Sequence, residues 1–292
     1  MIYTIENDVL RVQINSVGAE LWSIEDKRDG AEHLWQGDKE CWPRRAPVLF
    51  PHCGRLKENQ YTLKGQKYKS ELHGFARDYN HSVLESNDTS ITFLFSDNNE
   101  TREKYPYYFR LYTIFKLENE KLIQAFEVEN VSDEEMYFSI GYHTGYMIPF
   151  DVKHRPEDYS IVFETEETPV EVKCNESGLL SGEKKVYFER QRTIPLNNKL
   201  FINGSLALEN IKSNHVSIIE NDSGKEVRIG IDGFPVTVLW SIPGEVKFVC
   251  IEPWFGLPDL YDTDGDFSKK PCIQVLSKGK IFSCKQIIEI LK

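Results

Sequence analysis

Two features that would place the protein outside the cytoplasm are missing from its 292 residues. No apolar run approaches the length of about 20 residues that crosses a membrane as a helix. The start, MIYTIENDVLRVQINSVGAEL, alternates apolar and polar residues and carries acidic side chains early, unlike the basic start and apolar stretch of a secretion signal. These absences predict a cytoplasmic protein without a membrane partner.

Cysteine is sparse and shows no pattern, with six residues scattered along the chain and no CxxC motif. Such spacing is typical neither of a disulfide framework nor of a zinc site. In a cytoplasmic protein, isolated cysteines are most simply reduced core thiols. We therefore expect free cysteines, no metal and no cofactor.

Positive charge is also in short supply, because 46 acidic residues oppose 35 basic ones for a formal net charge of −11. An acidic surface repels nucleic-acid phosphates and anionic lipids, which argues against both as partners. Aromatic residues are plentiful instead, with 14 Tyr, 17 Phe and 5 Trp. They favour strands and offer flat apolar faces on which a sugar ring can stack.

Helical periodicity is scarce, and alternation of apolar and polar residues takes its place. Short strands at regular spacing, separated by turns such as 221–224, predict an all-β protein of the sandwich or barrel type. Only two helices are expected, over 100–105 and near 197–201, so under about a fifth of the residues should be helical. The polar, turn-rich stretch 151–185 is interpreted as an excursion from a single domain that covers residues 1–292. The predicted strands are 10–15, 19–26, 90–96, 110–117, 121–130, 135–140, 216–219, 227–231, 236–241 and 247–252.

Ionisable side chains stand beside glycine, proline and aromatic residues in four segments. A histidine near a strand end is usually structural, so each segment alone is a weak signal. Glu252 is more informative, because it follows the apolar run 248–251 and precedes Pro253, which ends the strand ladder. A carboxylate at the end of a buried strand is costly unless it has a task or a cation. The segments are Pro51-His52-Cys53-Gly54-Arg55, His73-Gly74-Phe75-Ala76-Arg77, Gly141-Tyr142-His143-Thr144-Gly145-Tyr146 and Cys250-Ile251-Glu252-Pro253-Trp254-Phe255-Gly256.

Taken in order, these segments and several shorter motifs resemble the aldose 1-epimerase (galactose mutarotase-like) superfamily, and most closely its LacX-like bacterial branch. The resemblance spans nearly the whole chain, and its strength lies in the order of the motifs. The resemblance implies a large two-sheet β-sandwich, in agreement with the strand pattern. The motifs are Gly54-Arg55-Leu56, Tyr61-Thr62-Leu63 with Gly65, Leu72-His73-Gly74-Phe75-Ala76-Arg77, Tyr105-Pro106-Tyr107 with Phe109, Val128-Glu129-Asn130, Gly141-Tyr142-His143, Pro149-Phe150, Phe234-Pro235, Trp240-Ser241, Pro243-Gly244 and Ile251-Glu252-Pro253-Trp254-Phe255-Gly256.

The resemblance also implies an activity, the interconversion of the α and β anomers of a small aldose by general acid–base catalysis. Glu252 would be the catalytic base and His143 the catalytic acid, while Arg55 and His73 would bind sugar oxygens. The classical enzymes add an aspartate ahead of their C-terminal motif. Asp232 is the nearest candidate, although Ile231-Asp232-Gly233-Phe234 departs from that motif.

These roles require the four side chains to lie close together. Arg55, His73, His143 and Glu252 should line one concave pocket, with Trp254 or Trp240 at its wall as a stacking surface. The ligand would be a small sugar, and no metal or covalent intermediate is needed.

Two other functions stay open. A related branch of the superfamily acts on hexose 6-phosphates and carries a motif like His73–Arg77, so Arg77 is a candidate phosphate ligand. The fold also supplies non-catalytic carbohydrate-binding sandwiches, which need no acid–base pair.

One acidic motif, Asp262-Thr-Asp264-Gly-Asp266, resembles the start of a calcium loop. It lacks glycine at the sixth position and has Ile273 rather than glutamate at the twelfth. A solvated acidic turn is the preferred interpretation.

Overall fold

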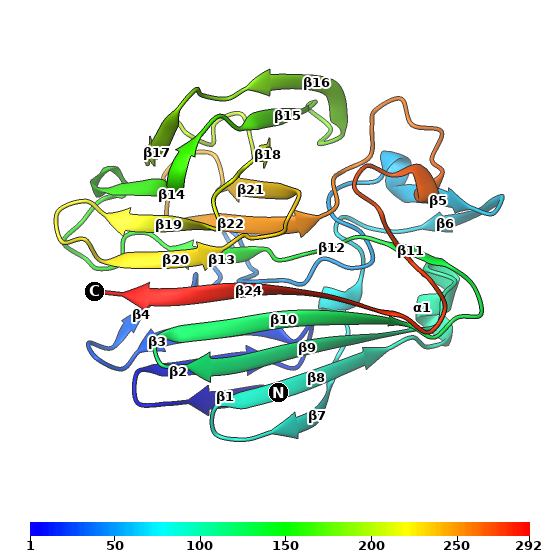
Figure 1. Cartoon of the computed structure of the whole chain (residues 1–292), viewed down its shortest axis with the longest axis horizontal. Helices are drawn as coiled ribbons and strands as arrows, with labels where there is room; N and C mark the ends of the chain where they lie inside the picture. The colour runs from blue at the N-terminus through cyan, green and yellow to red at the C-terminus, as the bar shows by residue number, and fades with distance from the viewer.

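The computed structural model describes residues 1–292 and is built mainly from antiparallel strands (Figure 1). Its only α-helix, α1 (Asn99–Lys104), has six residues and is capped by Asn98, whose side chain accepts a hydrogen bond from the Thr101 backbone N–H. The remaining helical segments are 3-10 turns of three residues each: η1 (Lys57–Asn59), η2 (Ala76–Asp78), η3 (Pro156–Asp158) and η4 (Phe267–Lys269). The all-β prediction is confirmed.

The largest layer is a nine-stranded sheet in the order β17-β14-β19-β20-β24-β10-β9-β8-β7. In Figure 1 its last strand, β24, runs between β20 and β10 and joins the two halves of the sheet. Its strands are β7 (Ser82–Ser86), β8 (Ser90–Ser96), β9 (Phe109–Glu118), β10 (Lys121–Asn130), β14 (Tyr159–Glu167), β17 (Gln191–Pro195), β19 (His215–Glu220), β20 (Glu226–Gly230) and β24 (Ile281–Leu291).

Two smaller sheets pack on one face of the nine-stranded sheet. A seven-stranded sheet has the order β12-β22-β21-β18-β15-β16, with β13 also paired to β22, and a four-stranded sheet has the order β1-β2-β3-β4. The seven strands are β12 (Ile140–Gly141), β13 (Thr144–Met147), β15 (Val170–Cys174), β16 (Leu180–Val186), β18 (Leu206–Glu209), β21 (Val236–Trp240) and β22 (Phe248–Phe255). The others are β1 (Ile2–Glu6), β2 (Leu10–Asn15), β3 (Glu20–Asp26) and β4 (Ala31–Glu32), with the two-stranded pairs β5 (Gln60–Leu63)–β6 (Gln66–Lys69) and β11 (Met136–Phe138)–β23 (Gln274–Leu276).

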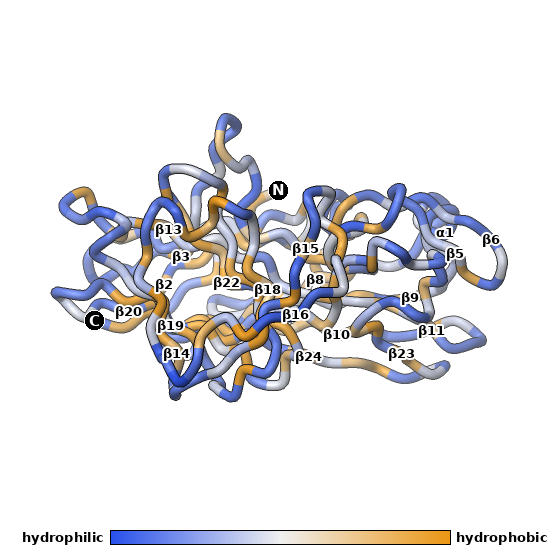
Figure 2. Tube along the Cα trace, turned by 90° about the horizontal axis from the view of Figure 1, so that it is seen from above, coloured by the Kyte–Doolittle hydropathy of each residue, from blue (hydrophilic) through white to orange (hydrophobic).

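Alternating side chains create the core between these layers. Along β10, every second residue from Leu122 to Asn130 is buried, whereas the residues between them are only partly buried. A cluster of 35 buried apolar residues joins the inner face of the nine-stranded sheet to both smaller sheets. Apolar residues accordingly follow the strands between the layers in Figure 2, and polar residues dominate the outer loops. The predicted β-sandwich is confirmed, with one of its two layers divided between two sheets.

Two sequence predictions about the middle of the chain are wrong. The stretch 151–185 is not an excursion, because β14 lies within the nine-stranded sheet and β15 and most of β16 belong to the seven-stranded one. The segment 197–201 forms turns rather than a helix. None of the helices is long and apolar enough to cross a membrane.

Substitutions on β24 test this layering. Ile288 is completely buried in the large cluster, so Ile288→Ala leaves a cavity and should lower the free energy of unfolding by about 2–5 kcal/mol. Ile281 lies on the same strand with 55% of its surface exposed, and Ile281→Ala should cost less than about 1 kcal/mol. Denaturant unfolding of the two variants gives both values, and equal losses would contradict the assignment of β24 to the core.

Candidate active site

A cavity of about 420 Å³ lies over the face of the seven-stranded sheet that points away from the nine-stranded one. Its floor consists of alternate residues from β18, β21 and β22, which stand opposite one another in the register: Ala207 pairs with Val238, and Val238 pairs with Glu252. The residues between them, such as Leu239 and Ile251, point the other way into the core. The period of two along each strand therefore sets which side chains face the cavity.

Loops from the first half of the chain close the cavity over this floor. They supply Trp42, Arg55, His73 and Arg77, while His143 enters just before β13. Arg55, His73, His143 and Glu252, predicted from the sequence to share one pocket, are brought together here. The tryptophans of the neighbouring strands, Trp240 and Trp254, also line it, as does Arg77.

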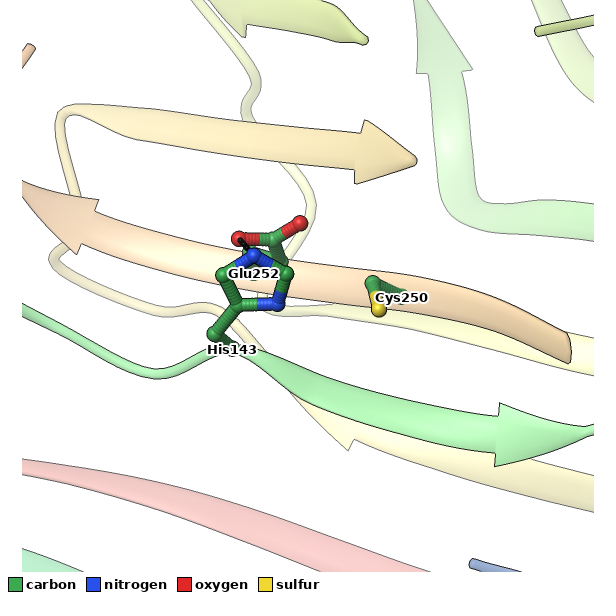
Figure 3. Close-up of side chains that lie close together, drawn as sticks. All are labelled: His143, Cys250 and Glu252. Atoms are coloured by element: carbon green, nitrogen blue, oxygen red, sulfur yellow. Dashed lines mark ion pairs between the residues drawn. The ribbon is translucent and has the colours of Figure 1, made fainter. Parts of the chain in front are cut away.

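Glu252 and His143 form a close pair at the bottom of the cavity (Figure 3). Glu252 Oε2 lies 3.4 Å from His143 Nε2, and the two residues are only 1% and 8% exposed. The separation is within ion-pair range, yet Glu252 Oε2 and His143 Nδ1 have no hydrogen-bond partner in the protein. The His143 ring stacks on Trp42, with ring centroids 5.0 Å apart, which fixes its plane against Glu252.

Burial shifts both members of the pair towards their neutral forms. It raises the pKa of Glu252 well above its usual range. Burial also lowers the pKa of His143 to about 3, and the positive charges of Arg77 and Arg44 add to this shift. A carboxyl group and an imidazole with such shifts are typical of groups that exchange protons with a ligand rather than of surface ion pairs.

His73 is held rigidly by the segment that contains Gly54. The Gly54 backbone N–H donates to His73 Nδ1 at 3.0 Å, and the His73 backbone N–H donates to the Gly54 carbonyl at 3.1 Å. Because Nδ1 accepts, the neutral ring carries its hydrogen on Nε2 and is a hydrogen-bond donor. His73 and Gly74 both have positive φ angles, and a Cβ on Gly74 would lie 2.3 Å from the Phe50 carbonyl oxygen. Only glycine permits this approach, which brings the histidine to the cavity.

Two guanidinium groups make the cavity wall positive. Arg55 is exposed and lies beneath the turn at Gly178. Arg77 is mostly buried: its Nη2 donates to the Leu72 carbonyl at 2.6 Å, whereas its Nε has no hydrogen-bond partner. Burial and the nearby Arg44 lower the pKa of Arg77 to about 10, so it stays positively charged at neutral pH.

Comparison with known proteins shows the family to which the chain belongs. The family model for aldose 1-epimerase matches residues 1–288. The chain belongs to the aldose 1-epimerase family. Its relatives include the plasmid-encoded protein LacX of Lactococcus lactis subsp. lactis, 33% identical over 93% of each chain. The family consists of isomerases that act on sugars, and the predicted membership is confirmed.

Solved structures extend the likeness to the whole fold. A galactose mutarotase related enzyme from Lactobacillus acidophilus is 35% identical and superposes with a TM-score of 0.96, over 100% of this chain and 98% of that one. A galactose mutarotase-like protein from Lactobacillus casei ATCC 334 is 28% identical, with a TM-score of 0.93 over 99% and 100% of the two chains.

One residue of this candidate site was missed in the sequence. Trp42 lines the cavity, stacks on His143 and contacts the edge of Trp240 at a centroid distance of 5.3 Å. It lies in a loop outside the strand pattern and outside the motifs. Its position between Cys41 and Pro43, in an otherwise polar stretch, was the only signal in the sequence.

Asp232 does not fit the role of sugar ligand that the sequence suggested. It lies in a separate hollow on the outer face of the nine-stranded sheet, with Lys121, His215 and Lys285. The turn after β20 points it to that face, and Phe234 packs against a different part of the core. The candidate site therefore has no aspartate from that segment.

Other polar motifs have structural partners. His52 is completely buried, and its Nε2 is 2.8 Å from the Ser70 hydroxyl. In the acidic motif, Lys269 forms salt bridges with Asp264 at 2.8 Å and Asp266 at 3.3 Å, as expected for a solvated turn.

Histidine titration tests the environment of the pair. His143 should remain neutral from pH 7 down to pH 5, because burial lowers its pKa to about 3. His154 is the internal control, since hydrogen bonds to Asp151 and Asp222 raise its pKa and it should be protonated at pH 5.5. NMR of the imidazole carbons, assigned with His143→Asn and His154→Ala, follows both rings. A His143 midpoint near pH 6.5 would contradict the buried geometry.

Proposed function

We propose that the protein is a sugar mutarotase that interconverts the α and β anomers of a small aldose, with Glu252 as base and His143 as acid. The observation that carries the proposal is the buried pair itself, whose Oε2 and Nε2 atoms lie 3.4 Å apart beside a cavity of about 420 Å³. That volume falls within the range of about 300–1,000 Å³ typical of small-molecule sites. Trp240 and Trp254 supply flat faces for the sugar ring.

The chemistry of a cyclic hemiacetal explains why two groups suffice. Ring opening removes the proton of the anomeric hydroxyl and delivers a proton to the ring oxygen, and both oxygens are bonded to the same carbon. An acid and a base a few ångströms apart therefore reach both atoms. Glu252 takes the hydroxyl proton while His143 protonates the ring oxygen. After rotation about the C1–C2 bond, the two groups act in reverse and close the ring on the other face.

The pair needs only one exchangeable proton for this cycle. In the sugar-free protein the pair is neutral, with the proton on Glu252. The reactive state, with the sugar bound, has the proton on His143 and an ionised Glu252, and ring opening returns the proton to Glu252. The pair has no net charge in either state, so proton transfer between its members never leaves a single buried charge on it. Burial favours the state with the proton on Glu252. That state accompanies the open-chain sugar, which is the high-energy species of the reaction.

The surrounding residues bind and orient the sugar. His73 can donate from Nε2 to a sugar oxygen, and Arg55 can donate from its exposed guanidinium. We also propose that residues 1–292 act as one domain, because the cavity draws on residues from Trp42 to Pro258.

A phosphorylated aldose is the second candidate substrate. Two guanidinium groups line one cavity in a chain whose net charge is −11, and Arg77 Nε is buried without a hydrogen-bond partner. A guanidinium with free donors suits a phosphate group, which it can bind through two parallel hydrogen bonds.

Substitution of the acid and base tests the first proposal. Glu252→Gln keeps the shape of the side chain and removes the base, so mutarotation should slow by about 10² to 10⁴, or roughly 3–5 kcal/mol of barrier. His143→Asn should cause a similar loss. The double variant should lose less than the product of the two, because both residues act in one step. Polarimetry of freshly dissolved α-glucose and α-galactose, corrected for the spontaneous reaction, gives the rates.

Two outcomes would contradict these roles. Wild-type mutarotation by Glu252→Gln would show that Glu252 is not the base. A wild-type protein that binds aldoses and aldose phosphates without accelerating their mutarotation would instead be a carbohydrate-binding sandwich.

Arg77→Ala separates the two substrate classes. If the substrate is a hexose 6-phosphate, the variant should raise its KM by tenfold or more, roughly the 1.4 kcal/mol lost with one charge-assisted hydrogen bond, and change kcat little. For a neutral aldose, KM and kcat should stay close to wild type. The neutral sugar serves as the control for Arg77→Ala, since structural damage around Leu72 would raise KM for both sugars. Equal KM changes for glucose and glucose 6-phosphate would exclude Arg77 as a phosphate ligand.

A further inference from the structure

The proposed mechanism leaves a thiol next to the acid–base pair, beneath the cavity floor, without a task. Cys250 precedes Glu252 by two residues on β22, so both side chains project from the same face of the strand (Figure 3). The Cys250 thiol is completely buried. One ligand atom each from Cys250, His143 and Glu252 lie within 4.8 Å of one another.

We propose that these three side chains form a binding site for a zinc-like divalent cation, with Cys250 Sγ, His143 Nε2 and Glu252 Oε2 as its protein ligands. Thiolate, imidazole and carboxylate are the groups that bind Zn²⁺ in proteins. The thiolate selects soft or borderline ions such as Zn²⁺, Co²⁺ and Cd²⁺ over Mg²⁺ and Ca²⁺, which prefer oxygen ligands. Spacing along the sequence could not reveal this site, because the histidine comes from a segment about a hundred residues away.

The distances suit a tetrahedral ion after a small adjustment. Zinc–ligand bonds of about 2.0–2.3 Å place the ligand atoms about 3.3–3.8 Å apart. His143 Nε2 and Glu252 Oε2 are already 3.4 Å apart. All three ligand atoms lie within 4.8 Å of one another, so movements of about 1 Å, which small rotations of the side chains provide, bring them to these distances. Three protein ligands leave the fourth position for water, as in the open zinc sites of enzymes.

An independent observation points to a ligand at this place. Glu252 Oε2 is buried, lies 3.4 Å from His143 Nε2 and has no hydrogen-bond partner. A buried polar atom without a partner costs about 1–3 kcal/mol. A cation bound to the carboxylate would supply the missing interaction.

A second cluster with similar composition makes a useful contrast. Asp151, His154 and Glu220 also bring three ligand atoms within 4.8 Å, but these atoms already have partners. His154 Nδ1 is 2.8 Å from Asp151, and Glu220 accepts a hydrogen bond from Tyr159. His154 therefore supplies a control substitution at a site that we do not expect to bind the ion.

Occupancy of this site would inhibit the enzyme, because the cation would hold both the base and the acid. Inhibition rests on the proposed roles of Glu252 and His143, whereas binding does not. Cys250 takes no part in proton transfer, so its removal should abolish the metal effect and leave metal-free mutarotation unchanged.

Titration of the purified chain with Zn²⁺ and with Co²⁺ tests the site. Calorimetry should show one tightly bound Zn²⁺ per chain, and Co²⁺ should give a sulfur-to-cobalt absorption band with the visible bands of a tetrahedral ion. Cys250→Ala should weaken Zn²⁺ binding at least about 100-fold, because even substitutions outside the ligand shell cost about 10–100-fold. The same variant should keep wild-type mutarotation in chelator-treated buffer and resist inhibition by Zn²⁺.

Two control variants separate this site from its neighbours. His154→Ala removes the second cluster, and Cys174→Ala removes the thiol that lines the cavity wall. Both should bind Zn²⁺ like the wild type. Absence of stoichiometric Zn²⁺ binding, or a cobalt–sulfur band that survives in Cys250→Ala, would overturn the proposal. If Cys250→Ala is unstable, Cys250→Ser preserves the shape and must still lose the sulfur band. A wild type that binds Zn²⁺ but shows no mutarotation would refute the proposed function and leave the metal site standing.

Discussion

The burial of Glu252 within the ladder of β22 is the constraint on which the site depends. Val249 and Ile251 anchor the strand in the main core, and alternation turns Cys250 and Glu252 to the other face. A carboxyl group placed there without solvent is costly, and the surrounding sheet has to compensate for it. Backbone pairing with β21 on one side and β13 on the other holds the strand, so the carboxyl group cannot move out to water.

The loops over the sheet bring polar side chains into the cavity that this carboxyl group lines. His143 is fixed by its stack on Trp42, and His73 by two hydrogen bonds with Gly54. His73 has a positive φ angle, which is an unfavourable backbone conformation for a histidine. The backbone pairing of the next residue, Gly74, with Phe50 compensates for this cost. Because His143 and His73 are held rigidly on loops and Glu252 on a strand, the geometry of the candidate site is formed before a ligand binds.

Much of the fold could be predicted from the sequence, because strands with one buried face carry the alternation that burial imposes. The strands β2, β8 and β10 begin and end where that pattern does. The pattern failed over 151–185, where β16 is mostly exposed along its length and so carries no alternation to detect. The cytoplasmic location stays a prediction.

Some residues of the candidate site could likewise be predicted from the sequence, and others could not. Residues in ordered motifs, such as Glu252 and His143, could be found from the chain alone, whereas Trp42 and the place of Asp232 depend on how loops turn in three dimensions.

A physical link connects the proposed catalysis with the proposed metal site. The atom of a general base that takes the proton must have a free lone pair facing the ligand. The loose, unpartnered contact between His143 and Glu252 meets this requirement. The same lack of a partner leaves Glu252 Oε2 free for a ligand, and Cys250 adds a third ligand atom within 4.8 Å. A cavity that keeps its acid and base free for a sugar is, for that reason, also open to a cation that binds all three side chains.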